Sequence, residues 1–303
     1  MADRIPVIVN ATAGNGSNPA WADGLQENFA AAGLQVDLKV MQQGSEIAPA
    51  VAAAVKQGAR LVVAGGGDGT VSAVAAGLAG TGVALGVLPM GTLNHFAKDL
   101  GIPLEQQPAI AVIAAGRQLE VDVGEVNGRV FINNSSLGLY PDIVRDREQR
   151  QRRLGQSKWR ALLEASITAA RRYPVLTVQV EVDGQTLTRR TPFVFIGNNQ
   201  YTMEGFEIGE RSALNCGELS LYLTHRMGRF GLLRLAVMAL LHRLDQARDF
   251  DMLTARDFMV KTGHRRLRVA TDGEVTVMEA PLRYRIRPAA LRVMVPAPQE
   301  QAP

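Results

Sequence analysis

A run of glycines around a single carboxylate is the part of this 303-residue sequence with the clearest chemical meaning. Four glycines lie within Gly65–Gly69, they flank Asp68, and Thr70 follows directly. Glycine lets the backbone approach a ligand that a Cβ atom would keep away, and the free amides at the start of a helix suit the oxygens of a polyphosphate. Asp68 fits such a site if Mg²⁺ or a hydrogen-bond donor lies between its carboxylate and the phosphates. The alternative is a tight turn in which Asp68 or Thr70 caps the helix.

Two more polar loops could contribute to the same site. Gly91–Asn94 follows a short hydrophobic segment; Thr92 offers a hydroxyl to a phosphate, and Asn94 could contact a nucleotide or cap the next helix. Asn10, with Gly14 behind it, could supply a third loop, although on its own it is only a turn. No Gly-x-x-x-x-Gly-Lys-Ser/Thr motif occurs, so backbone amides and hydroxyls would have to hold phosphate without a P-loop lysine.

The elements that position these loops follow from the hydrophobic pattern of the first 120 or so residues. Short apolar segments alternate with helical ones, which predicts a parallel sheet covered by helices on both faces. The expected strands are residues 5–10, 34–40, 60–64 and 83–88. Three helices are expected: one that ends at residue 32, one over residues 46–57 and one over residues 70–78. Because parallel strands end at one edge of their sheet, the three loops should meet there.

The pattern changes after about residue 120. Apolar and polar residues alternate over Leu176–Asp183 and over Leu219–Thr224, as they do in half-buried antiparallel strands. Asp183-Gly184 and Asp272-Gly273 are dipeptides typical of tight hairpin turns. The second half should therefore be mostly antiparallel β-structure. Helical insertions are expected near residues 158–172 and 229–244.

Composition excludes several classes of protein. Hydrophobic residues make up 47% of the chain and charged residues 20%, which indicates a folded globular protein and not a disordered or fibrous one. The net charge of +4 favours an anionic partner such as a nucleotide or a membrane surface, and we expect no nucleic-acid partner. The single cysteine, Cys216, excludes an internal disulfide framework. No apolar stretch approaches the roughly 20 residues of a membrane span, so we expect a soluble, cytoplasmic protein.

Four motifs, in this order along the chain, resemble the catalytic domain shared by diacylglycerol kinases, sphingosine kinases and bacterial lipid kinases. Asn10–Gly14 is similar to the family's Asn-Pro-x-Ser-Gly opening, Gly66–Thr70 matches its nucleotide signature, and Pro89–Asn94 resembles its second loop. Asp272–Glu274 resembles the Asp-Gly-Glu element whose glutamate is the family's proposed general base. The match is specific as a set, whereas Gly-Gly-Asp-Gly alone would also fit NAD kinases and phosphofructokinases.

The resemblance implies both a fold and an activity. An N-terminal three-layer α/β nucleotide-binding domain would cover residues 1–122, with residues from about 286 to 303 packing back onto it, and a C-terminal antiparallel β-sandwich domain for the lipid substrate would cover residues 123–285. The implied reaction transfers the γ-phosphoryl group of ATP to a hydroxyl of a diacylglycerol-like lipid. Glu274 and Asp68 are the implied catalytic residues, Glu274 as the base and Asp68 as the ligand of Mg²⁺, through water. The implied nucleotide-binding residues are Asn10, Gly14, Gly66, Gly67, Asp68, Gly69, Thr70, Gly91, Thr92 and Asn94.

Several positions depart from the family pattern. His95 stands where many bacterial members carry an aspartate, and Met41 replaces a threonine at the end of the second strand. Ser72 and Ala73 stand in place of an asparagine and a glutamate. Cys216 occupies the position of an aspartate that holds a structural Mg²⁺ in some bacterial members. A neutral thiol is a poor ligand for this hard cation, so we expect that site to be missing or altered.

Other interpretations stay open for the segments that bear on a lipid. Residues 145–160 are rich in arginine and could contact anionic headgroups at the inner membrane surface or form a solvated helix. Residues 229–244 could line an acyl-chain channel or pack in the core, and Glu274 could be a solvent-facing residue beside a hairpin turn. The rival functions are a kinase of a soluble hydroxyl compound, like NAD kinases, and an ATP-binding module with weakened catalysis. Asp272–Glu274 favours a lipid kinase of phospholipid biosynthesis, and the sequence leaves a homodimer open.

Overall fold

The computed structural model describes the chain as two compact units. The described residues are 4–11, 19–138, 176–204, 207–211, 213–224 and 250–297. Unit 1 comprises residues 1–123, 213–216 and 287–303, and unit 2 comprises residues 124–212 and 217–286. Two strands, β5 (Gln118–Val126) and β18 (Leu282–Met294), contribute residues to both units.

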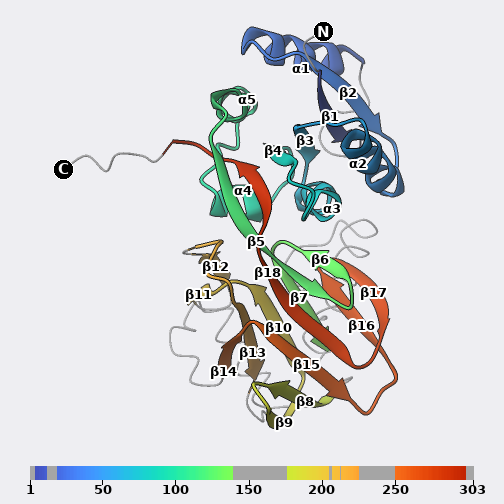
Figure 1. Cartoon of the computed structure of the whole chain (residues 1–303), viewed down its shortest axis with the longest axis vertical. Helices are drawn as coiled ribbons and strands as arrows, with labels where there is room; N and C mark the ends of the chain where they lie inside the picture. Colours follow the sequence, from blue (N-terminus) through green and yellow to red (C-terminus); the bar gives the residue numbers. More distant parts are fainter. Residues whose placement is uncertain are drawn as a thin grey trace, which may run out of the picture. The chain divides into compact units, whose positions relative to one another are not determined.

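Unit 1 is built on a parallel sheet (Figure 1). The strand order is β2-β1-β3-β4, and the last part of β18 pairs in parallel with β4. The strands are β1 (Ile5–Asn10), β2 (Val36–Met41), β3 (Leu61–Gly66) and β4 (Ala84–Pro89). Continuous buried runs such as Val7–Val9 and Val62–Ala64 are those expected of strands covered on both faces.

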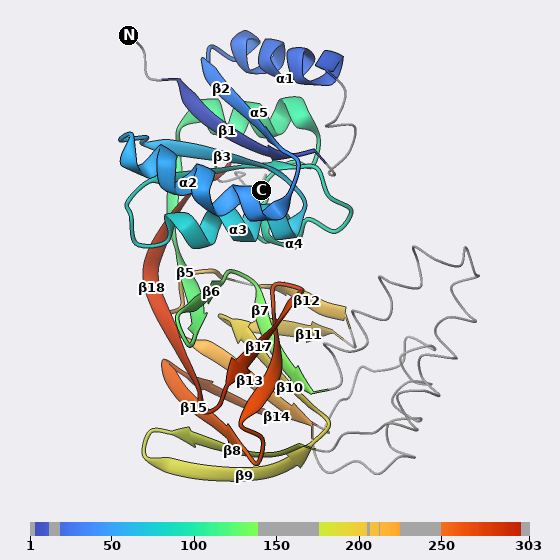
Figure 2. The same cartoon turned by 90° about the vertical axis from the view of Figure 1, so that its right-hand side faces the viewer.

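Helices cover both faces of this sheet. Figure 2 shows α1 and α5 on one side of it and α2 and α3 on the other. The helices are α1 (Pro19–Ala31), α2 (Ile47–Lys56), α3 (Asp68–Leu78), α4 (His95–Asp99) and α5 (Gln106–Ala115), with a 3₁₀ turn, η1 (Gly44–Glu46), before α2. None of the helices in the described residues has the length and hydrophobicity needed to cross a bilayer. The predicted three-layer α/β architecture is confirmed.

Unit 2 contains two sheets of mainly antiparallel strands. One sheet has the strand order β14-β13-β10-β7-β16-β17. The other has the order β9-β8-β15-β18, in which the first part of β18 belongs to unit 2. Strand β5 pairs with β18, and β6 pairs with β5. The strands are β6 (Arg129–Phe131), β7 (Asn134–Gly138), β8 (Leu176–Val182), β9 (Gln185–Thr191), β10 (Phe193–Asn198), β13 (Leu219–Thr224), β14 (Phe250–Ala255), β15 (Asp257–Thr262), β16 (Arg266–Thr271) and β17 (Glu274–Glu279). A separate short hairpin pairs β11 (Tyr201–Glu204) with β12 (Glu207–Arg211).

The core of unit 2 lies between its two sheets. Buried side chains from both sheets form one cluster, which includes Leu137 and Val269 from the first sheet and Val180 and Tyr284 from the second. Tyr284 stacks on Phe258 with ring centroids 5.1 Å apart, and its hydroxyl lies 3.1 Å from Ser135 Oγ across the core. Burial raises the pKa of the Tyr284 phenol. The predicted β-sandwich is thereby confirmed.

The local predictions differ in their outcomes. The alternating segments at residues 176–183 and 219–224 are strands, and both Asp-Gly dipeptides turn hairpins, with Asp183 and Asp272 in the left-handed region at φ 48°. At the first glycine loop, β3 continues to Gly66 and α3 begins at Asp68, both slightly beyond the expected limits. The helical insertions expected near residues 158–172 and 229–244 lie outside the described residues.

Candidate functional site

The end of β3 and the start of α3 form the first glycine loop. Gly67 is the N-cap residue of α3, and its carbonyl accepts the N–H groups of Thr70 (3.0 Å) and Val71 (3.1 Å). Thr70 is buried against Gly66, where an added Cβ would lie 2.6 Å from Thr70 Oγ1. No side chain caps this helix, so the alternative interpretation, a cap by Asp68 or Thr70, is wrong. The amides at the start of α3 are therefore not covered by a capping side chain.

The second glycine loop is in direct contact with the first. The Met90 N–H donates to the Gly66 carbonyl (2.9 Å), and a Cβ added to Gly91 would lie 2.5 Å from the Cα of Gly67. On the other side, a Cβ added to Gly65 would lie 2.8 Å from a methyl group of Val9 in β1. The exits of β1, β3 and β4 thus meet at one edge of the sheet, as their parallel order requires. This contact is possible only because the facing residues are glycines.

Asn94 holds the second loop closed. Its Oδ1 accepts the Gly91 N–H (3.0 Å) and its Nδ2 donates to the Gly91 carbonyl (2.8 Å). Asn94 precedes α4 but forms no side-chain cap with it, and its φ of 51° lies in the left-handed region that asparagine tolerates. Of the two interpretations of Asn94, the helix cap is wrong, because the side chain turns back to Gly91. Thr92 and Leu93 are exposed between these two residues, and no sequence pattern singled out Leu93, which is 52% exposed.

The third loop is described only at its start. Asn10 ends β1 and is paired in register with Met41, the last residue of β2. The next residue, Ala11, is buried and donates its N–H to the Met41 carbonyl (2.9 Å). Gly14 lies outside the described residues. Of the third loop, the structure therefore brings Asn10 to the edge where the two glycine loops meet.

The Asp68 carboxylate is available to a ligand. Asp68 is the first residue of α3, at the positive end of the helix dipole. Within the described ranges its side chain has no hydrogen bond or ion pair, and no three His, Cys, Asp or Glu side chains cluster as a metal site. A lone carboxylate at a helix start that no side chain caps fits Mg²⁺ that is bound by one protein oxygen, water and phosphate oxygens. It does not fit a metal cage made of protein ligands alone.

In unit 2, Asp272 fixes the turn between β16 and β17. Its carboxylate accepts three successive backbone N–H groups, those of Ile132 (2.9 Å), Asn133 (2.8 Å) and Asn134 (3.1 Å). Its own N–H donates to the Asn134 carbonyl (2.9 Å). Hydrogen bonds to a carboxylate are among the stronger ones in proteins. Asp272 is thus an anchor for the loop between β6 and β7, a role that the sequence did not reveal.

Glu274 lies on the far side of the same turn and faces solvent. Its side chain is 61% exposed, and its Oε2 accepts a hydrogen bond from Arg129 Nη2 (2.7 Å). Arg129 Nε also donates to Thr271 Oγ1 (2.8 Å). Exposed ion pairs of this kind contribute about 0–1 kcal/mol to stability. Glu274 is thus exposed beside a hairpin turn, and this exposure leaves its carboxylate accessible to a substrate.

A buried arginine supports the loop that Asp272 holds. Arg211 donates to the Ile132 carbonyl (2.6 Å) and to Asn133 Oδ1 (2.9 Å), and its guanidinium carbon lies 5.3 Å from the centre of the Tyr201 ring. Asn198 Nδ2 donates to the same Ile132 carbonyl (2.9 Å). The amides of this loop are therefore bound to Asp272 and its carbonyls to buried donors. Several buried hydrogen bonds thus hold this loop in one conformation.

The segment around Cys216 lies in unit 1. Cys216 is exposed and forms no disulfide, and the nearby Leu214 carbonyl accepts the Asp122 N–H (2.8 Å). The expectation that a structural Mg²⁺ site is missing or altered here stays a prediction.

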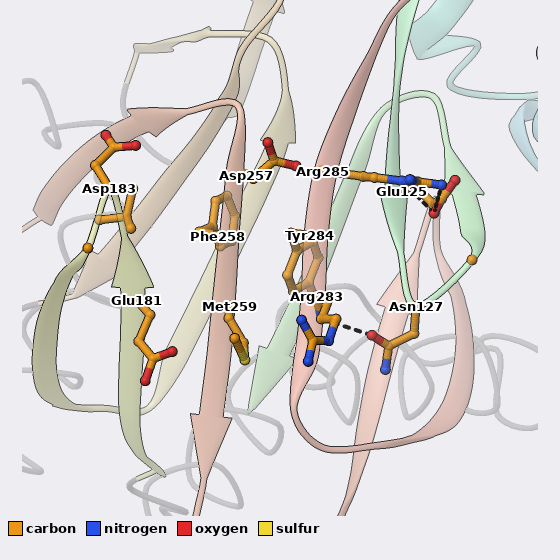
Figure 3. Close-up of a pocket in the computed structure, with 13 residues that line it drawn as sticks. Glu125, Asn127, Glu181, Asp183, Asp257, Phe258, Met259, Arg283, Tyr284 and Arg285 are labelled. Carbon is orange, nitrogen blue, oxygen red and sulfur yellow. Dashed lines mark hydrogen bonds and ion pairs between the residues drawn. The ribbon is translucent and has the colours of Figure 1, made fainter.

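An open pocket of about 660 Å³ lies in unit 2 away from the predicted residues (Figure 3). It is lined by residues of β5, β8, β15 and β18 and of the turns that follow β5 and β8. Glu125 accepts a hydrogen bond from Arg285 Nε (2.8 Å) and forms an ion pair with Nη2 (2.7 Å), and the hydrogen bond and the charge of Glu125 raise the pKa of Arg285. Glu181 is paired with Lys261. Because its acidic groups include two that are already paired with cations and it contains no glycine loop, we assign this pocket no ligand.

Two protein-family models match this chain, one over most of unit 1 and one over most of unit 2. The model of the diacylglycerol kinase catalytic domain matches residues 4–126, and that of the YegS C-terminal NAD kinase beta sandwich-like domain matches residues 142–295. An uncharacterized Synechocystis protein is 31% identical over 204 residues, which are 63% of this chain and 46% of that protein. A diacylglycerol kinase of Bacillus subtilis is 28% identical over 280 residues, 89% of each chain.

A solved structure shows the same fold. The crystal structure of a diacylglycerol kinase from Bacillus anthracis matches with a TM-score of 0.70 and 19% identity, and the match covers 97% of both chains. At this identity the likeness concerns the fold alone.

Proposed function

The chain belongs to the diacylglycerol kinase catalytic-domain family, and we propose that it transfers the γ-phosphoryl group of ATP to a hydroxyl group of a diacylglycerol-like lipid. The observation that carries the proposal is the contact between Gly67 and Gly91, which brings two loops together at the start of α3. Phosphoryl transfer requires a protein chiefly to position the reactants and to neutralise charge. Converging backbone amides at a helix start can do both.

The residues of unit 1 would bind the nucleotide and its metal ion. The amides of Gly66–Gly69 and the exposed Thr92 hydroxyl would hold the phosphates, with Gly91 and Asn94 shaping the second loop; the Thr70 N–H already donates to the Gly67 carbonyl. Asp68 would hold Mg²⁺ through water, since its carboxylate has no partner among the described residues. When bound, Mg²⁺ supplies positive charge that offsets the charge of the phosphates.

Glu274 would act as the general base. Its carboxylate takes the proton of the acceptor hydroxyl, the hydroxyl oxygen bonds to the γ-phosphorus, and the bond from that phosphorus to the β–γ bridging oxygen breaks. The products are a phosphorylated lipid and ADP. A well-placed base accelerates such a step by about 10²–10⁴.

The lipid acceptor would be met at a membrane surface. The Bacillus subtilis relative is named a diacylglycerol kinase, which supports this class of acceptor. We propose that the protein works in the cytoplasm and binds the inner membrane surface peripherally. The arginine-rich residues 145–160, which could contact headgroups, lie outside the described residues.

Incubation with labelled ATP, Mg²⁺ and a total lipid extract, followed by identification of the product, tests the proposal. A labelled lipid is expected, and Glu274→Gln should lower turnover at least about a hundredfold while the ATP affinity stays within about twofold. Label only in a soluble compound would instead indicate a kinase of soluble hydroxyl compounds. ATP binding with no transfer would indicate a binding module, and the absence of any nucleotide affinity would exclude a kinase.

A further inference from the structure

Arg129 connects the two sides of the turn that carries Glu274. Nε donates to Thr271 Oγ1 (2.8 Å) just before the turn, and Nη2 donates to Glu274 Oε2 (2.7 Å) just after it. We infer that Arg129 is a positioning residue that orients Glu274 for proton abstraction, an inference that rests on the proposed function. Arg129 lies in the β5–β6 hairpin, whereas Glu274 lies in the β16–β17 hairpin.

The backbone that carries Arg129 is itself held in place. Arg129 begins β6, directly after the Asn127-Gly128 turn. The Asn127 side chain accepts the Arg283 N–H (2.8 Å), as Figure 3 shows, and donates to the carbonyls of Glu279 (3.0 Å) and Pro281 (3.3 Å). Arg129 therefore extends from a hairpin that is bonded to the end of β17 and the start of β18. A fixed origin and the bond to the buried Thr271 leave the guanidinium little freedom.

The bond to Oε2 has a consequence for the rest of the Glu274 carboxylate. A glutamate that is 61% exposed would sample many rotamers if nothing held it. Arg129 restricts that sampling through Oε2, and within the described residues Oε1 has no hydrogen bond. A proton acceptor must be held close to its productive geometry. Glu274 thus has one oxygen that fixes its orientation and one that can accept the substrate proton.

The opposite end of the same hairpin supplies a natural control. Arg266 lies 3.7 Å from Glu279 through Nε, and both side chains are well exposed (72% and 61%). Arg266 lies in β16, which pairs with β17, the strand that carries Glu279. The distance between Arg266 Nε and Glu279 Oε1 is longer than that of a hydrogen bond. Both are exposed Arg–Glu pairs, but only the Arg129 pair adjoins the proposed base.

The test measures kcat and KM for Arg129→Met, Arg129→Lys, Glu274→Gln, the Arg129→Met/Glu274→Gln double variant and the Arg266→Met control. Arg129→Met should lower kcat about 10- to 100-fold with the KM for ATP within about twofold. Arg129→Lys should restore part of the loss, because lysine keeps the charge but cannot bridge both partners as a planar guanidinium does. Arg129→Met should have less than about a twofold effect when Glu274 is already glutamine. Arg266→Met should match the wild type in turnover and thermal unfolding.

Two results would overturn the inference alone. One is an Arg129→Met variant whose kcat stays within about twofold of wild type; the other is an equal loss from Arg129→Met in the wild-type and Glu274→Gln backgrounds. Failure of the proposed function has a different signature. In that case the wild-type protein phosphorylates no lipid, or Glu274→Gln keeps full turnover, and the role of Arg129 is rejected together with that of the base.

Discussion

The glycine loops of unit 1 and the Asp272-Gly273 turn of unit 2 reach defined geometries by opposite means. The loops approach each other because side chains are missing: a Cβ on Gly91 would lie 2.5 Å from the Cα of Gly67. The turn is defined because side chains are present, with three amides bound to Asp272 and the Ile132 carbonyl of the same loop bound to Arg211. Steric bulk should therefore damage the first region, and loss of a hydrogen-bonding group should damage the second.

The strongest test of this contrast is Gly91→Ala. The new methyl group would meet backbone atoms, which cannot rotate away, so the two loops must separate. We expect the ATP affinity to fall about a hundredfold, equivalent to about 2.7 kcal/mol, while far-ultraviolet circular dichroism stays that of the wild type. Isothermal titration with Mg-ATP measures the affinity.

Gly24→Ala is the control for that substitution. Gly24 lies within α1, and an added Cβ there would have no atom within 4 Å. Its ATP affinity should stay within about twofold of wild type, and alanine should slightly stabilise the helix. A Gly91→Ala variant that binds ATP as tightly as Gly24→Ala would remove the loop contact from the binding site.

The second region should respond to a substitution that changes no volume, Asp272→Asn. Asparagine has one acceptor oxygen and an NH₂ group, so at least one of the three backbone N–H groups would face a donor. We expect the free energy of unfolding, measured with urea, to fall by about 2 kcal/mol. Asp183→Asn is the matched control: Asp183 occupies the corresponding Asp-Gly turn between β8 and β9 with the same φ of 48° and is exposed. Equal losses from both variants would refute the anchoring role.

The two regions also differ in how much of each the sequence could predict, because contacts in the first are local and those in the second join distant residues. The glycine loops were predictable because the pattern is local: glycines follow a buried strand, and the Cβ-free contact is between the ends of adjacent strands. The hairpin at Asp272-Gly273 was predictable for the same reason, since the dipeptide itself favours the turn. The partners of that turn were not predictable. Arg129 and Glu274 are 145 positions apart, and Arg211 and Ile132 are 79 apart, so only the folded sheets bring them together.

Burial explains the remaining differences. Asn94 could have capped the helix that follows it, as an exposed asparagine in that place would, but it is 7% exposed and its amide is bonded to Gly91. No sequence pattern predicted the burial of Arg211, because an arginine is usually a surface residue. Its burial at 4% exposure depends on acceptors supplied by distant strands. Sequence patterns indicate the candidate site residues here more readily than the groups that hold them in place.

Asp68→Asn should have a smaller effect on ATP affinity than Gly91→Ala and a smaller effect on stability than Asp272→Asn. It separates a residue that would bind a ligand from the residues that shape the loops of unit 1. Because the Asp68 carboxylate has no protein partner among the described residues, its replacement should change the free energy of unfolding by at most about 0.5 kcal/mol, the scale of a helix-dipole interaction. The ATP affinity measured with Mg²⁺ should fall about tenfold, equivalent to about 1.4 kcal/mol, and the affinity measured with EDTA should stay near wild type. Asp23→Asn, an exposed aspartate on α1, should change neither affinity. If Asp68→Asn destabilised the protein as much as Asp272→Asn, Asp68 would be a structural anchor, and its assignment to Mg²⁺ would lose its basis.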